Sequence, residues 1–180
     1  MNEIFVKDAL ERLFKQFEYI ADHDLPMLPI VDGASSEIFV GDADSEGWIR
    51  WRPKVKNEFF DLSELEKNAN IRIHDSIKVL LNSWWFGYLS VKFSDCRFDI
   101  DTIIPGNYKV AFLQKLIGYR AAHQGRLDYI PIGMEVERDL LLVVKNSSGE
   151  ICVEDFSVGS YQIICESLPK FFVTCSDNLN

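Results

Sequence analysis

The chain has 180 residues, of which 47% are apolar and 13% aromatic, so it can build one sizeable core and is not of the intrinsically disordered class. Its 28 acidic and 19 basic residues give a formal net charge of −9, which disfavours nucleic acid and anionic lipid as partners. The longest apolar run, residues 140–144, is too short to cross a bilayer, and no apolar secretion signal follows the first methionine. We expect one cytosolic domain over residues 1–180, with a frayed tail at 173–180 and no direct membrane insertion.

The first quarter of the chain predicts a helix followed by irregular structure. Apolar residues recur at helical spacing over residues 5–21. The breakers Pro26 and Pro29 come next, then a short strand at residues 37–40 and a polar loop at 41–47.

Residues 22–46 concentrate negative charge, with seven acidic residues and no lysine or arginine. A field of this kind attracts basic partners over a distance. The acidic residues are Asp22, Asp24, Asp32, Glu37, Asp42, Asp44 and Glu46.

Residues 48–55 alternate as a strand, which Pro53 either places at an edge or ends. The basic face could contact phosphate, although four charges in a row are more typical of a solvated face or of pairing with the acidic loop. Trp48 and Trp51 fit either a protein contact or core packing, and Trp51 shares the apolar face. The basic face consists of Arg50, Arg52, Lys54 and Lys56, and the apolar face of Ile49, Trp51, Pro53 and Val55.

The remaining chain predicts alternating helices and hairpins, and therefore the α+β class with a mixed, mostly antiparallel sheet packed against helices. The last predicted element is a helix that Ser160 caps. The other helices are predicted at residues 61–68, 74–86 and 108–123, and the strands at 87–94, 97–104, 128–134, 140–145 and 150–156.

No catalytic motif stands out, and the sequence predicts no catalytic residue, metal or cofactor. Glycine-rich phosphate and dinucleotide fingerprints are absent, and the four cysteines form no C-x-x-C pair. His23 lies between two aspartates and could bind a metal or orient a base, but a solvated loop is the simpler interpretation. His74 and His123 lie at predicted helix ends, where a structural role is expected. Asp99 and Asp101 share one face of a strand, as either an acid/base pair or two surface carboxylates.

Several short motifs, in order and spacing, resemble the Syd family of SecY-interacting proteins from gammaproteobacteria. The resemblance covers about residues 48–172, and each motif is weak without the others. The motifs are residues 116–119, 124–127, 137–141 and 146–152, together with Trp51 and Pro53, Ile73, His74 and Ile77, and Phe86 and Gly87.

This resemblance implies an α+β domain of the SUKH superfamily with a concave acidic face. It also implies a non-enzymatic protein that binds basic cytosolic loops of SecY and regulates or checks the export translocase. Such a protein is cytoplasmic and peripherally associated with the inner membrane. An alternative within the superfamily is an immunity protein that neutralises a basic toxin domain, and a third hypothesis is an enzyme that uses His23.

The sequence therefore predicts a partner-binding surface built from acids and exposed aromatic residues. The hairpin acids (Asp95, Asp99 and Asp101) rank first because a strand holds such side chains in place, which lowers the ordering cost of binding. The other candidates are Asp42, Asp44 and Glu46 on the acidic loop, with Trp48 and Trp51 beside it.

Overall fold

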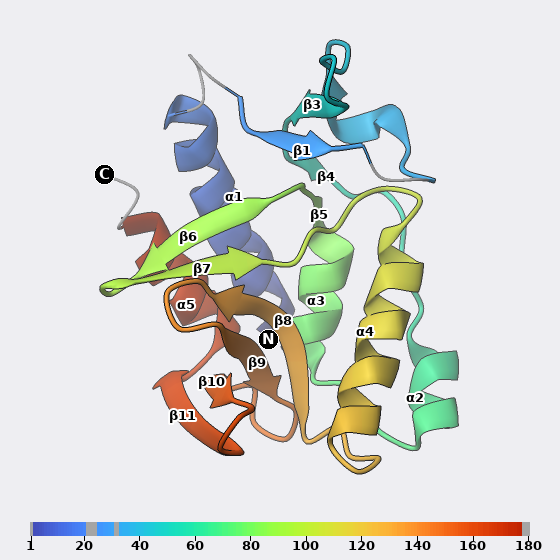
Figure 1. Cartoon of the computed structure of the whole chain (residues 1–180), viewed down its shortest axis with the longest axis vertical. Helices are drawn as coiled ribbons and strands as arrows, with labels where there is room; N and C mark the ends of the chain where they lie inside the picture. Colours follow the sequence, from blue (N-terminus) through green and yellow to red (C-terminus); the bar gives the residue numbers. More distant parts are fainter. Residues whose placement is uncertain (1, 21–24, 31–32, 178–180) are drawn as a thin grey trace.

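The computed structural model describes residues 2–20, 25–30 and 33–177, which form five α-helices, one short 3-10 helix and eleven strands (Figure 1). The helices are α1 (Asn2–Ile20), η1 (Ser36–Ile38), α2 (Ser63–Ala69), α3 (Asp75–Ser83), α4 (Tyr108–Ala122) and α5 (Leu168–Asp177). The strands are β1 (Met27–Pro29), β2 (Phe39–Val40), β3 (Trp48–Trp51), β4 (Lys54–Val55), β5 (Trp84–Trp85), β6 (Leu89–Phe93), β7 (Cys96–Ile100), β8 (Tyr129–Glu135), β9 (Leu140–Lys145), β10 (Ile151–Asp155) and β11 (Ser160–Cys165).

A six-stranded antiparallel sheet, in the order β11-β10-β9-β8-β7-β6, forms the centre of the fold. Helices α1 and α5 lie behind it in Figure 1. The ring of Phe171 on α5 packs against Phe93 on β6 and Phe98 on β7, with ring centroids 5.0 and 5.7 Å apart. These contacts bury the apolar face of the sheet and hold α5 in place.

A smaller three-stranded sheet, β1-β3-β2, lies at the top of the molecule in Figure 1. Its central strand contributes Trp51, which is fully buried. Gly87 lies against that ring, since a Cβ atom at this position would come within 2.8 Å of Trp51 and 2.3 Å of Leu28. The small sheet can therefore approach the rest of the fold only because position 87 has no side chain.

The predicted α+β class with mostly antiparallel strands is confirmed, and so is the helix at 108–123, which is α4. The final helix predicted from Ser160 is wrong in its first half, because residues 160–165 form β11. The first four residues of β11, an edge strand, are all exposed. The alternation of buried and exposed residues that is typical of a strand is therefore missing. The chain is then helical to Asp177, where the sequence predicts a frayed end from residue 173.

Helix α3 is shorter than predicted, because the chain leaves the helix at Ser83 and pairs Trp84 and Trp85 with β4. The apolar stripe of the sequence runs on through both tryptophans, so helical spacing alone does not show this end. At residues 37–40, a turn of 3-10 helix precedes the two-residue strand β2.

The strand predicted at 48–55 is interrupted at Pro53, which changes the faces of the residues that follow. Ile49 and Trp51 point inward as expected. After the proline, however, Val55 is exposed and Lys56 is buried, the reverse of the prediction. Because Pro53 cannot extend the ladder, β4 starts a new pairing with β5 and the alternation restarts. Lys56 therefore does not belong to the basic face.

The ammonium group of Lys56 lies in a pocket of aromatic rings. Its Nζ is 3.6 Å from the ring centroids of both Trp85 and Tyr108, and it donates a 2.6 Å hydrogen bond to the carbonyl oxygen of Leu81. Among the described residues, no carboxylate lies within ion-pair distance of it. Burial lowers the pKa of Lys56 to about 7, although the rings and the carbonyl favour the charged form.

We expect the buried lysine to make stability depend on pH. Between about pH 7 and pH 10 the unfolded chain holds a proton on Lys56 that the folded chain has lost, so the free energy of unfolding rises with pH by up to about 1.4 kcal/mol per unit. Lys56→Met removes this contribution. Any gain in the free energy of unfolding of the variant over the unmodified protein is therefore largest below pH 7 and shrinks towards pH 10. Urea unfolding of both proteins across this range measures the difference.

Lys54→Met is the matched control, since Lys54 lies two residues away and its side chain is exposed. The difference in the free energy of unfolding between Lys54→Met and the unmodified protein should not change between pH 7 and 10. If the difference between Lys56→Met and the unmodified protein is also independent of pH, burial does not lower the pKa of Lys56.

Candidate functional site

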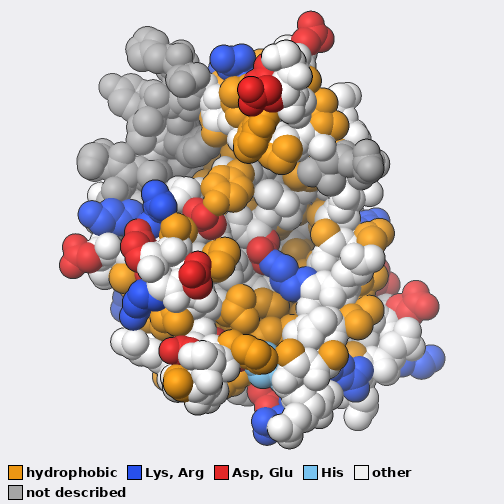
Figure 2. Space-filling view, in the orientation of Figure 1, with side chains coloured by type: hydrophobic (Ala, Val, Ile, Leu, Met, Phe, Trp, Pro, Cys, Tyr) orange, Lys and Arg blue, Asp and Glu red, His pale blue; other side chains and the backbone are white. Residues whose placement is uncertain are grey.

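Helix α4 and strand β8 run side by side on the face shown in Figure 1, and two cavities lie between them. The inward stripe of α4 comprises Tyr108, Phe112, Leu116 and Tyr119, which recur every three or four residues and are all buried. Figure 2 shows apolar side chains gathered in the hollow between the sheet and this helix. We call this region the α4 groove.

The first cavity, near the start of α4, has a volume of about 230 Å³ and mostly apolar walls. Its lining comes from α3, from α4, from the end of β7 with the segment that follows it, and from the middle of β8. We call it the apolar cavity. Its lining includes Ile77, Leu80, Leu81, Ile100, Ile103, Tyr108, Ala111, Phe112, Pro131 and Ile132, with Asp101, Thr102 and Lys115 as its polar members.

The three hairpin acids are not equivalent, and only one of them lines the apolar cavity. Asp101 lines the cavity and pairs with Lys115 of α4. Asp99 accepts a hydrogen bond from the Tyr88 hydroxyl, which raises the pKa of that phenol. Asp95 lies exposed in the turn between β6 and β7. Two of the three predicted contact acids therefore already have a partner within the chain.

The second cavity, of about 150 Å³, lies where α4 ends and β8 begins. Beside it, the buried carboxylate of Glu154 on β10 accepts hydrogen bonds from the Tyr119 hydroxyl at 2.7 Å and the Tyr161 hydroxyl at 3.0 Å. The Nε2 atom of His123 lies 2.5 Å from the same carboxylate. The ring of Tyr129 stacks on Tyr161, with centroids 4.0 Å apart. We call these five residues the Glu154 cluster.

The Glu154 cluster joins elements that are distant in the sheet order. Tyr129 is on β8 and Tyr161 on β11, three strands apart, so their stacking requires the sheet to curl. His123 is the C-cap of α4, and its Nδ1 atom lies 2.7 Å from the Tyr119 carbonyl oxygen, which can only accept. His123 therefore donates from Nδ1 to this carbonyl oxygen. Burial is the main cause that raises the pKa of both Tyr119 and Tyr161.

Sequence reasoning placed His123 correctly at a helix end but missed Glu154. The available signal was a carboxylate directly after the apolar run at residues 151–153, next to strand residues that must be buried. A charge in that position is expected to have a partner. The sequence cannot say which partner, because Tyr119, His123 and Tyr161 approach Glu154 only after the sheet curls.

The acidic loop is an ordered turn. Asp44 Oδ1 accepts hydrogen bonds from the backbone N–H groups of Glu46 and Trp48, each 2.9 Å long. Asp42, Asp44, Glu46 and Trp48 are all exposed. Trp51 is fully buried and packs in the core, so it is no longer a candidate for contact with a partner. Asp22, His23, Asp24 and Asp32 lie outside the described residues.

The acidic loop and the hairpin acids do not share one small surface. Figure 1 places the loop between β2 and β3 at the top of the molecule and the β6–β7 turn at its left edge. On the face in Figure 2, the described acidic side chains are dispersed among basic and apolar ones. A partner that contacts both acidic regions must therefore be extended.

A larger depression, of about 990 Å³, is not acidic. Its charged lining consists of four cations and two carboxylates, and it lies between the start of α3 and the turns around β8 and β9. The charged residues are Arg72, Arg120, Arg126, Lys145, Asp75 and Asp128. This depression does not match a face that receives a basic segment.

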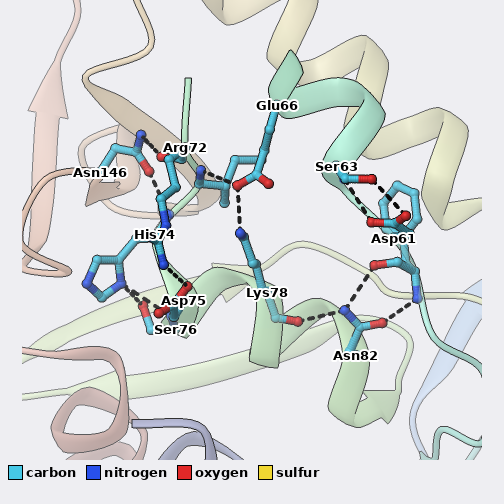
Figure 3. Close-up of polar contacts among 12 residues, drawn as sticks. Asp61, Ser63, Glu66, Arg72, His74, Asp75, Ser76, Lys78, Asn82 and Asn146 are labelled. Atoms are coloured by element: carbon cyan, nitrogen blue, oxygen red, sulfur yellow. Dashed lines mark hydrogen bonds and ion pairs between the residues drawn. The ribbon is translucent and has the colours of Figure 1, made fainter. Parts of the chain in front are cut away.

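One wall of this depression explains two of the motifs found in the sequence (Figure 3). Asn146 accepts a hydrogen bond from the backbone N–H of His74 and donates one to the carbonyl oxygen of Arg72, both 2.8 Å long. His74 Nδ1 accepts from the backbone N–H of Ser76 and so caps α3. Gly149 has a φ of +79°, and a Cβ atom there would lie 2.4 Å from the His74 ring. These motif residues hold the β9–β10 turn against α3, which is a structural role.

Comparison with known proteins identifies the family. The Syd protein (SUKH-2) family model matches residues 7–176, nearly the whole chain. The chain belongs to this family. Protein Syd of Aliivibrio fischeri (strain MJ11) is 25% identical over 175 residues, which cover 92% of each protein. Protein Syd of Idiomarina loihiensis is 22% identical over 139 residues, or 75% of each.

Two properties of the described residues bear on how the protein works. None of their helices is both long and apolar enough to span a bilayer. Across the same residues, no three His, Cys, Asp or Glu side chains come together as metal ligands do.

We expect the Glu154 cluster to be a major source of stability. Glu154→Gln leaves His123 and two hydroxyls without their carboxylate, so the free energy of unfolding should fall by about 3–5 kcal/mol. Tyr161→Phe removes one donor and should cost about 1 kcal/mol. Urea unfolding followed by circular dichroism measures both. A Glu154→Gln cost no larger than that of Tyr161→Phe would show that the cluster does not act as a buried charge pair.

Proposed function

We propose that this protein binds a basic cytosolic segment of SecY without catalysing a reaction, and that it regulates or checks the export translocase. In this proposal the protein acts at the cytoplasmic side of the inner membrane as a peripheral factor. Membership of the Syd family is the observation that carries the proposal. The Syd names of its relatives favour SecY over a toxin as the partner.

The charge of the molecule supports a basic partner. A net charge of −9 creates a long-range attraction that speeds encounter, and exposed carboxylates contribute most to it because they are not neutralised locally. Asp95 and the acidic loop meet this condition. Asp99 and Asp101 are held close to fixed positions by Tyr88 and Lys115, so they contribute a pre-organised contact instead.

We expect the affinity for SecY to fall as salt rises from low to physiological ionic strength, because salt screens exposed charges. Binding to purified SecY complex in lipid nanodiscs, measured by biolayer interferometry across this range, provides the check. An affinity that does not change with salt would contradict an electrostatic contact.

Neutralising the rim of the α4 groove should weaken binding more than neutralising charge elsewhere. Asp99→Asn with Asp101→Asn should lower the affinity by about ten-fold, mostly through slower association, while thermal stability stays nearly unchanged. The control, Glu58→Gln with Glu64→Gln, removes the same charge from exposed positions around α2. Equal losses in the two variants would show that only the total charge matters and would move the contact away from the hairpin acids.

A further inference from the structure

We infer that the apolar cavity of the α4 groove is the anchor pocket for one aromatic side chain of the basic partner segment. The inference rests on the proposed function and adds to it an apolar contact that charge alone does not supply. In protein interfaces, a few large side chains that enter well-packed pockets supply most of the affinity, while charged rims steer the encounter.

The size of the cavity selects a single side chain. Its volume of about 230 Å³ is below the roughly 300–1,000 Å³ typical of pockets for drug-sized ligands. An apolar cavity of about 150 Å³ is already large enough for benzene. One indole or phenol ring therefore fits, whereas a cofactor or a longer peptide stretch does not.

The chemistry of the walls favours an aromatic ring. Tyr108 and Phe112 present rings from α4, and isoleucine side chains from α3, β7 and β8 complete the lining. Aromatic rings gain from edge and offset contacts beyond the area that they bury. Tryptophan and tyrosine also carry one polar atom, which can stay at the mouth of the cavity beside Thr102.

The mouth of the cavity favours a cation next to that ring in the partner. Asp101 lines the mouth and is paired with Lys115, whose side chain is about one-third exposed. A lysine or arginine of the partner can replace Lys115 at this carboxylate, so the exchange does not leave a buried charge without a partner. Asp99 and the exposed Asp95 extend the negative charge along the same hairpin. The partner segment therefore combines a ring with neighbouring basic residues.

The cavity can be tested without SecY by using free indole, the side-chain group of tryptophan. In protein labelled at the isoleucine δ1 methyls, indole should shift the signals of Ile77, Ile100, Ile103 and Ile132, which line the cavity. The signals of three core isoleucines outside the lining should not shift, namely those of Ile38, Ile49 and Ile151. Absence of saturable shifts at the four lining methyls would overturn the anchor pocket.

A matched pair of helix variants then links the cavity to the partner. Ala111 lines the cavity, whereas its neighbour Val110 is exposed and does not. Ala111→Leu should block the mouth and lower the affinity for both indole and SecY complex by at least about ten-fold, since anchor residues carry this share of binding. Val110→Leu should bind both as the unmodified protein does. Equal SecY binding by the two variants would overturn the inference.

The outcomes separate this inference from the proposed function. Competition between indole and SecY complex supports the anchor, whereas indole binding without competition would make the cavity a site for small aromatic molecules and overturn the anchor. If the unmodified protein does not bind SecY complex at all, the proposed function fails together with the anchor. If it binds with the expected salt dependence but Ala111→Leu has no effect, only the anchor fails.

Discussion

The α4 groove depends on the buried carboxylate of Glu154. Three groups from α4 and β11 converge on it, and all of them would lose a buried carboxylate partner if it moved. That penalty is larger than the net gain of an ordinary hydrogen bond, so the cluster strongly disfavours a shift of the helix end relative to the sheet. The position of the end of α4, and with it the shape of the second cavity, follows from this constraint.

Curling of the sheet is the second consequence of the same cluster. Tyr161 on the edge strand reaches Tyr129 on β8 although two strands lie between them. A flat sheet would hold these rings more than 10 Å apart, since neighbouring strands are about 4.7–4.9 Å apart. The curl brings β11 round towards the end of α4, where Tyr161 approaches Tyr119 and Glu154. The concave acidic face that the family resemblance implies stays a prediction.

The sequence predicted those parts of the fold that depend on local pattern. Helix α4 and the hairpins of β6 with β7 and of β9 with β10 have clear periodicity and turn residues. The errors are strand pairings that the spacing of apolar residues does not show. Lys56 is buried because β4 pairs after Pro53 with β5, a strand distant in the sequence, and that pairing leaves no signal in the nearby residues. Residues 160–165 form a strand because they turn back on β10 as a hairpin, and the signal for it was the turn that ends in Gly159 rather than the spacing of apolar residues.

The candidate site shows why a charge pattern is an incomplete guide to binding. Asp42, Asp44 and Glu46 lie in a turn that Asp44 organises. Asp99 and Asp101 are engaged by Tyr88 and Lys115. A carboxylate that already has an internal partner gains little net energy from a second cation, because the exchange replaces one ion pair by another. Such acids can set the orientation of a basic segment, but a large free energy of binding requires apolar burial. In the α4 groove, the apolar cavity next to Asp101 is the feature that can provide it.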